Sequence, residues 1–206
     1  MQTLGDIEPY QQREQYSCGA ATLKAVLKNY GTDYDERMLI KLVGVDPKSG
    51  SSAAQVASAA RRLGYDAQPL RFDSIDELAT YTNDDIPVIV AIRSFNRPDQ
   101  GHFVIADEID DTYVHIMDPN VRGNRRSVTR HELDQRWLFR DRTGVMITPR
   151  GQLGRALARR RTSWRGAFGA GLDRTKAAWV AAGVGVAAAV TTAVLVVRRR
   201  RALGIG

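Results

Sequence analysis

The sequence predicts an α+β protein in which N-terminal helices pack on an antiparallel sheet and a hydrophobic helix follows near the C-terminus. Three observations predict this class. Apolar residues in 18–63 have helical spacing, those in 66–148 form short extended segments separated by turns, and residues 177–197 carry no charge. Helices and strands in separate blocks favour an α+β fold, whereas strict alternation would favour a parallel sheet.

Three helices are expected first. The segment from Cys18 to Tyr30 carries apolar residues along one side, and Gly31 follows as a natural stop. The remaining two are expected at 35–42 and at 51–63, where Ser51 or Ser52 can cap the N-terminus.

After Gly64 the pattern changes to extended segments. The strands that we expect are 66–72, 87–92, 102–109, 113–117 and 144–148, with helices at 74–81 and 129–137. Residues 102–109 and 113–117 form the clearest hairpin, because a polar turn with Asp110 and Asp111 joins them. Beyond Asn120 the chain is expected to cross a basic loop.

Charge divides the chain into four parts. Residues 1–149 are net acidic and are expected to form the folded domain, although the whole chain carries a net charge of +7. The rest divides into a basic, Arg- and Gly-rich linker at 150–176, a membrane-spanning helix at 177–197 and a basic tail at 198–206.

The apolar run at 177–197 is long enough for a membrane. Its 21 residues would extend roughly 30 Å as a helix, the thickness of a bilayer core. A buried or surface-lying helix is the alternative. The basic residues flank this run without base-stacking aromatic residues, so they indicate a membrane partner and no nucleic acid.

Localisation follows from the two ends of the chain. No basic and apolar signal segment follows Met1, so the N-terminal domain is expected in the cytoplasm of a single-pass membrane protein. The positive-inside rule does not settle this topology, because both flanks of 177–197 are basic.

Cys18 is the only cysteine of the chain. A single cysteine excludes an internal disulfide and a structural zinc site built from several thiols, and no metal or other cofactor is expected. At the start of a helix, the macrodipole and free backbone N–H groups stabilise a thiolate. Cys18 is therefore either a nucleophile or a packed thiol, and Gly19 would leave the sulfur uncrowded.

A nucleophilic thiol needs a base, and the chain offers three histidines. His102 opens a strand, and Asp118 ends the partner strand; if the hairpin is centred on Asp110, both lie eight residues from its centre, opposite each other on one face. Asp118 could then orient the imidazole. His115 has the opposite parity and His131 begins a helix, so both are expected to be structural.

The oxyanion of an acyl transfer needs hydrogen-bond donors. The backbone N–H of Cys18 is one candidate. Gln11, Gln12 and Gln15 compete for the second place, and composition does not choose among them.

These motifs carry a resemblance. The chain resembles cysteine peptidase family thirty-nine, the papain-like peptidases that process bacteriocin leaders. The resemblance rests on three motifs in this order: Gln12, five residues and then Cys18-Gly19-Ala20-Ala21; Gly101-His102-Phe103-Val104-Ile105-Ala106; and Ile116-Met117-Asp118-Pro119. The resemblance covers residues 8–149 and implies a papain-like fold, with Cys18, His102 and Asp118 as catalytic triad and Gln12 in the oxyanion hole. Ser17 departs from the family, where an acidic residue is common.

The resemblance implies a peptidase that cleaves a leader or precursor peptide after Gly-Gly, with a possible ABC exporter as partner. Many members are domains of such exporters, but this chain has no nucleotide-binding P-loop, so a stand-alone member is expected. The alternatives are a silent leader-binding module, a papain-like γ-glutamyl transferase, and a tail-anchored structural protein whose small residues at 181, 185 and 189 pair in the bilayer.

Overall fold

The computed structural model describes residues 7–158, which belong to one compact unit. Its helices are α1 (Cys18–Asn29), α2 (Glu36–Val43), α3 (Ala53–Arg62), α4 (Ile75–Thr82) and α5 (Arg130–Leu138). Its strands are β1 (Asp66–Arg71), β2 (Val88–Arg93), β3 (Gly101–Ile109), β4 (Tyr113–Met117), β5 (Arg125–Thr129) and β6 (Thr143–Thr148). The predicted α+β class is confirmed.

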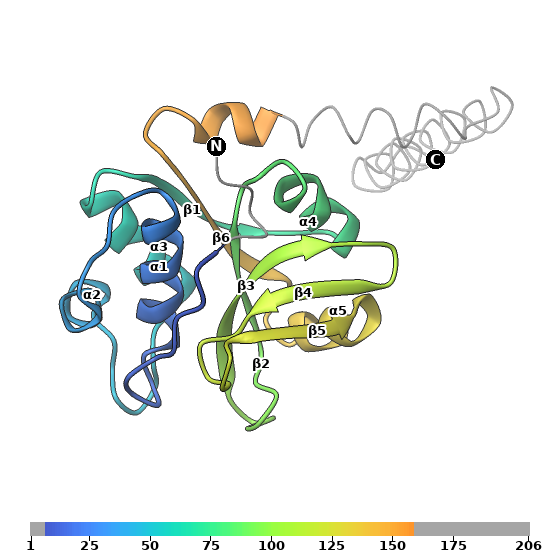
Figure 1. Cartoon of the computed structure of the whole chain (residues 1–206), viewed down its shortest axis with the longest axis horizontal. Helices are drawn as coiled ribbons and strands as arrows, with labels where there is room; N and C mark the ends of the chain where they lie inside the picture. Colours follow the sequence, from blue (N-terminus) through green and yellow to red (C-terminus); the bar gives the residue numbers. More distant parts are fainter. Residues whose placement is uncertain (1–6, 159–206) are drawn as a thin grey trace, which may run out of the picture. The chain divides into compact units, whose positions relative to one another are not determined.

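The six strands form one antiparallel sheet in the order β1-β6-β2-β3-β4-β5 (Figure 1). β6, the last strand within residues 7–158, lies between β1 and β2. It pairs with β1 along its whole length and with β2 over three residues. The hairpin of β3 and β4 lies next to β2, and its open end, with the start of β3 and the residues after β4, shares a cleft with the start of α1.

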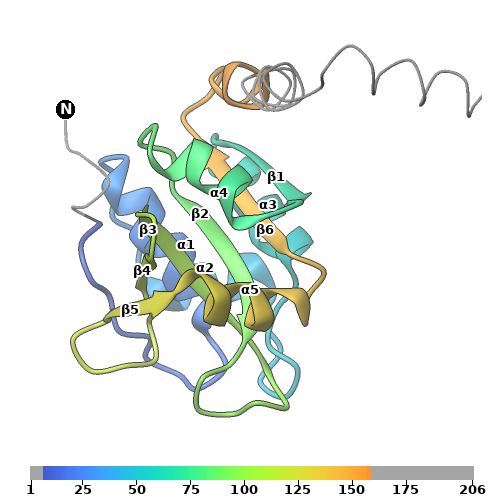
Figure 2. The same ribbon diagram turned by 90° about the vertical axis from the view of Figure 1, so that its right-hand side faces the viewer.

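Helices cover both faces of the sheet (Figure 2). α1, α2 and α3 form one hydrophobic core with the first face, and α4 and α5 form a second core with the other. Along β2, Ile89 and Ala91 point into the first core, whereas Val88, Val90 and Ile92 point into the second. Burial on both faces explains why this strand is a continuous apolar run in the sequence.

The predicted helix starts agree with the observed caps. Asp35, Ser74 and Thr129 each accept a hydrogen bond from a backbone N–H of the first turn of their helix. Of the two candidates for α3, Ser52 is the cap, and it forms a reciprocal capping box with Gln55.

One predicted element was wrong. The basic loop expected after Asn120 contains β5, which pairs with β4 at the edge of the sheet. Its sequence, Arg-Arg-Ser-Val-Thr, buries only Val128. A charged edge strand lacks a clear hydrophobic alternation, and charges at an edge discourage pairing with another chain.

The C-terminal predictions fall largely outside the described residues. Residues 153–158 are helical, and Ala156 is buried in the second core, so packing continues past residue 149. The linker beyond 158, the helix at 177–197 and the tail at 198–206 are not described. Within 7–158, none of the helices has the length and apolarity needed to cross a membrane.

Candidate active site

Cys18 is the first residue of α1, and its helix begins without a side-chain cap. Ser17 occupies the capping position, but its hydroxyl donates to Glu36 Oε1 at 2.7 Å and also lies 2.9 Å from the Glu14 carbonyl oxygen. No capping oxygen therefore competes for the N–H groups of the first turn. They remain available to a thiolate or to a developing oxyanion.

His102 and Asp118 form a buried pair. His102 Nε2 lies 2.7 Å from Asp118 Oδ1, and both residues are less than a tenth exposed. Because an ionised carboxylate only accepts, Nε2 carries a proton, and Nδ1 remains for the hydrogen bond between His102 and Cys18. The structure thus brings together three of the four predicted site residues.

The register of the hairpin differs from the prediction. Ile105 is opposite Met117, so Asp118 follows opposite Val104, two residues from His102. The turn closes from Asp110 to Tyr113, which shifts the pairing by three residues, and a bulge at Asp107 takes back one of them, so the net shift is two residues. His102 and Asp118 are therefore diagonal neighbours of the same parity, which still allows their side chains to meet.

The environment favours a thiolate–imidazolium pair. Burial raises the pKa of the Cys18 thiol, but His102 and the backbone N–H groups of Gly19 and Phe103 outweigh it, so the pKa lies below its usual value. Burial alone would lower the pKa of His102, yet its bonds to Asp118 and Cys18 raise that pKa to about 9. Burial likewise opposes ionisation of Asp118, but His102 holds the pKa of this carboxyl low.

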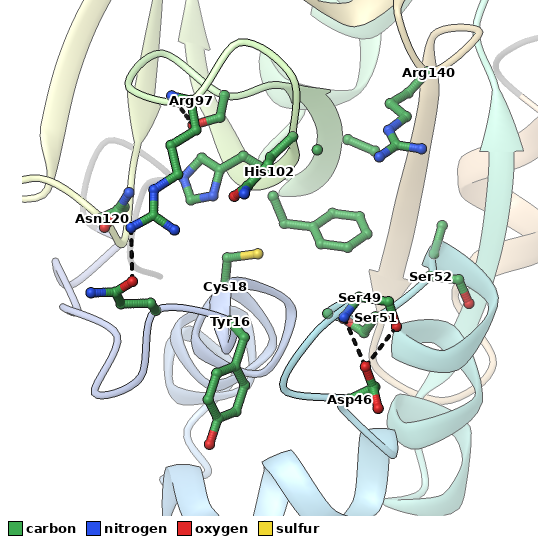
Figure 3. A pocket seen from close by; sticks show the side chains of 18 of the residues that line it. Tyr16, Cys18, Asp46, Ser49, Ser51, Ser52, Arg97, His102, Asn120 and Arg140 are labelled. Carbon is green, nitrogen blue, oxygen red and sulfur yellow. Dashed lines mark hydrogen bonds between the residues drawn. The ribbon is translucent and has the colours of Figure 1, made fainter.

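The pair opens into a cleft of about 1120 Å³. In Figure 3 the sulfur of Cys18 points into the cleft beside the His102 ring. One side carries Arg97 and Asn120, and the other carries Arg140 and the loop from Asp46 to Ser52. Arg97 donates to Gln15 Oε1 at 2.7 Å, which joins the loop before β3 to the loop before α1.

The three candidate glutamines lie in different places. Gln12 is partly buried, and its side chain donates to the Glu14 carbonyl at 2.8 Å, while its own N–H donates to the Pro119 carbonyl at 2.9 Å. It therefore lies beside the Asp118 turn but does not line the cleft. Gln15 lines the cleft, and Gln11 is exposed.

The other histidines are away from the thiol, as expected. His115 is partly exposed and its Nδ1 lies 2.8 Å from the Ser127 hydroxyl, and His131 is exposed on the first turn of α5. No three His, Cys, Asp or Glu residues within 7–158 are arranged to hold a metal ion.

Sequence reasoning missed the role of Glu36. This fully buried carboxylate accepts from the Ser17 hydroxyl, from the Tyr10 hydroxyl at 2.9 Å and from the Arg13 N–H at 3.2 Å. It holds the loop that leads to Cys18, and no motif marks it because its contacts are long-range. Gly19 also has a different role from the one expected: it is buried, and it permits close contact with Ser51, Val56 and Phe103.

A thiol at a helix N-terminus beside a buried histidine–aspartate pair is an arrangement typical of papain-like cysteine peptidases. The chain belongs to the Peptidase C39 family, whose model matches residues 6–150. It is accordingly a cysteine-type peptidase.

Similarity to individual proteins agrees with this assignment. The chain is 30% identical over 141 residues to the lactococcin-G-processing and transport ATP-binding protein LagD of Lactococcus lactis, a match that covers 68% of the chain and 18% of LagD. In fold it is similar to the peptidase domain of Streptococcus ComA, a bifunctional ABC transporter involved in quorum sensing, with a TM-score of 0.59 and 21% identity over 70% of this chain and 99% of that domain. A double glycine motif protease from an AMS/PCAT transporter, solved in complex with the leader peptide, is similar with a TM-score of 0.58 and 24% identity. This match covers 72% of the present chain and 96% of that protease.

Proposed function

We propose that the chain hydrolyses a peptide bond of a leader or precursor peptide after Gly-Gly, with Cys18, His102 and Asp118 as its catalytic triad. The observation that carries the proposal is the buried His102–Asp118 pair beside the only thiol, at the edge of a cleft. LagD is named for processing lactococcin G, which supports a peptide substrate of this kind.

In the proposed mechanism, the Cys18 thiolate attacks the carbonyl carbon and a thioester forms as the C–N bond breaks. The His102 imidazolium gives its Nδ1 proton to the leaving amine. It then accepts a proton from the water that hydrolyses the thioester, which releases the carboxylate and restores the thiol. Asp118 accepts the Nε2–H bond throughout and stabilises the imidazolium.

Gln12 is the proposed second donor of the oxyanion hole, beside the N–H of Cys18. Its amide must leave the Glu14 carbonyl to reach the oxyanion, a change of one side-chain hydrogen bond. Gln12→Ala should lower kcat by about 10²-fold or more, the usual cost of one oxyanion donor. Gln11 is the exposed neighbour of Gln12, so Gln11→Ala is the matched control and should leave kcat unchanged.

The proposal is tested with a synthetic leader peptide that contains Gly-Gly, followed by mass spectrometry of the products. Cleavage after the second glycine by the wild-type chain, and none by Cys18→Ala, is the expected result. A matched peptide with Ala-Ala should remain intact. Equal cleavage by Cys18→Ala would refute the triad, and products conjugated to an added thiol would reveal acyl transfer in place of hydrolysis.

For the whole chain we propose a peptidase domain at 1–149 in the cytoplasm, a linker at 150–176, a single membrane span at 177–197 and a tail at 198–206. An ABC exporter is the proposed partner, because LagD joins processing and transport in one protein. Fractionation of cells that express the full chain, compared with a chain that ends at 158, tests the anchor. Recovery of both in the soluble fraction would refute it.

A further inference from the structure

Asp118 has a second charged neighbour besides His102. Both hydrogen bonds to its carboxylate, from His102 Nε2 and from the Asn120 N–H at 2.9 Å, end on Oδ1. The other oxygen, Oδ2, lies 3.7 Å from Nε of Arg126 on β5. Arg126 stands opposite Ile116 on β4, so the register of the edge strand brings its side chain next to the end of β4.

The guanidinium of Arg126 is held by an aromatic ring. Its Cζ lies 4.1 Å from the ring centroid of Phe95, and Cζ of Arg136 lies 4.2 Å from the same centroid. Two guanidinium groups, from β5 and α5, therefore contact one ring. Arg136 is anchored on α5 by Glu132 at 3.1 Å and donates to the Ser94 carbonyl at 3.3 Å. Stacking of this kind favours a fixed guanidinium plane.

Apart from the Phe95 ring and Asp118, the surroundings of Arg126 within residues 7–158 offer its Nε–H no favourable interaction. Its Nε is buried and has no hydrogen-bond partner among the described residues. A buried N–H without a partner is unfavourable. The charge of Asp118, which is 2% exposed, is the feature of the surroundings that favours keeping Nε there.

We propose that Arg126 is a positioning residue that fixes the plane of the Asp118 carboxylate and keeps it ionised, with Phe95 holding the guanidinium in place. The inference rests on the proposed triad. The charged groups that face Asp118 are His102 from β3 and Arg126 from β5, with Cys18 beyond His102 and Arg136 behind the Phe95 ring. With Oδ1 bonded and Oδ2 facing a cation, both oxygens are constrained, and the imidazole that depends on them is oriented.

Because Cys18 is the only thiol, its reaction with iodoacetamide reports the state of the triad without a substrate. The full chain is alkylated across a range of pH as wild type, Arg126→Gln, Arg126→Lys and Arg122→Gln. Arg122 is exposed in the turn before β5, so its variant is a matched control that removes a nearby positive charge from solvent. The same variants are assayed on a fluorogenic peptide amide that ends in Gly-Gly.

Loss of the Arg126 charge makes Asp118 easier to protonate, so the acid limb of the Arg126→Gln alkylation profile should move to higher pH. In Arg126→Lys the acid limb should return to its wild-type pH, and in Arg122→Gln it should stay at the wild-type pH. Peptide cleavage by Arg126→Gln should fall by roughly two- to fivefold in kcat with little change in KM, the rate equivalent of a partly exposed ion pair.

The outcomes distinguish a failure of the proposed triad from a failure of the proposed role of Arg126. If the wild-type thiol reacts like a free cysteine, with half-maximal alkylation near pH 8.5, the triad itself is wrong. If the wild-type thiol reacts well below that pH but Arg126→Gln has the same profile as Arg122→Gln, the triad stands and the role of Arg126 is refuted. Failure of Arg126→Lys to restore the limb would likewise refute a role through charge.

Discussion

Gly19→Ala is the sharpest test of how α1 is placed against the sheet. A Cβ at this position would overlap Oγ of Ser51, and it would lie 3.1 Å from Cγ2 of Val56 and 3.3 Å from Cδ2 of Phe103. Ser51 can rotate its hydroxyl away, but Val56 and Phe103 belong to the first hydrophobic core and have little room to move. The helix must therefore shift by a few tenths of an ångström, and Cys18 shifts with it.

The magnitude follows from two opposing contributions. Overpacking a core costs about 1–3 kcal/mol, while replacing a helical glycine with alanine gains up to about 1 kcal/mol. The net loss should be about 1–2 kcal/mol, or roughly 5 °C in melting temperature for a domain of this size. The rate of Cys18 alkylation near neutral pH should fall as well, because the contact with His102 depends on the same placement.

Thermal melts and alkylation rates of four proteins complete the test: wild type, Gly19→Ala, Ser51→Ala and the double variant. Ser51 Oγ has no hydrogen-bond partner within residues 7–158, so Ser51→Ala alone should be nearly neutral. In the double variant it should recover about 0.5–1 kcal/mol of the stability lost through Gly19→Ala. A Gly19→Ala protein with wild-type melting and alkylation would refute the close contact between α1 and β3.

Three further results are expected. Because Asp118 and Cys18 raise the pKa of His102 to about 9, peptidase activity should decline as the pH rises through 9, and Asp118→Asn should move this decline to lower pH; an unchanged decline would contradict the pairing. Glu36→Ala leaves several donors unpaired in the interior and should cost about 3 kcal/mol in urea unfolding. Gly101→Ala places a Cβ 2.9 Å from Cζ of Arg140, but this exposed side chain can move, so the melting temperature should change by less than about 2 °C.

The sequence predicted most of the fold because its local signals agree with the tertiary structure. The periodicity of α1, the capping residues and the hairpin of β3 and β4 each depend on neighbours in the chain. β5 was missed because an edge strand with one buried residue has no such pattern. The hairpin register was wrong by two residues because the turn closes between Asp110 and Tyr113, three residues from the assumed register, and a bulge that leaves no mark in the sequence takes back one of them.

The candidate site also contains residues that the sequence could indicate and residues that only the structure reveals. The sequence could nominate Cys18, His102 and Asp118 as the candidate triad because their residue types and positions in the chain form a recognisable motif. Glu36 and Arg126 act through contacts with residues that a motif search does not connect to them. The motif assigns Gln12 to an oxyanion hole, whereas the hydrogen bonds that it makes with the Glu14 and Pro119 carbonyls depend on loop conformation.

The central position of β6 has a consequence for how the chain becomes active during its synthesis. Cys18, His102 and Asp118 have all been made by the time the ribosome reaches residue 143, yet β1 has no strand to pair with until β6 follows. The helical half and the hairpin half are therefore joined into one sheet by the last strand. A nascent chain therefore contains its thiol well before the sheet that lies beneath α1 can be completed.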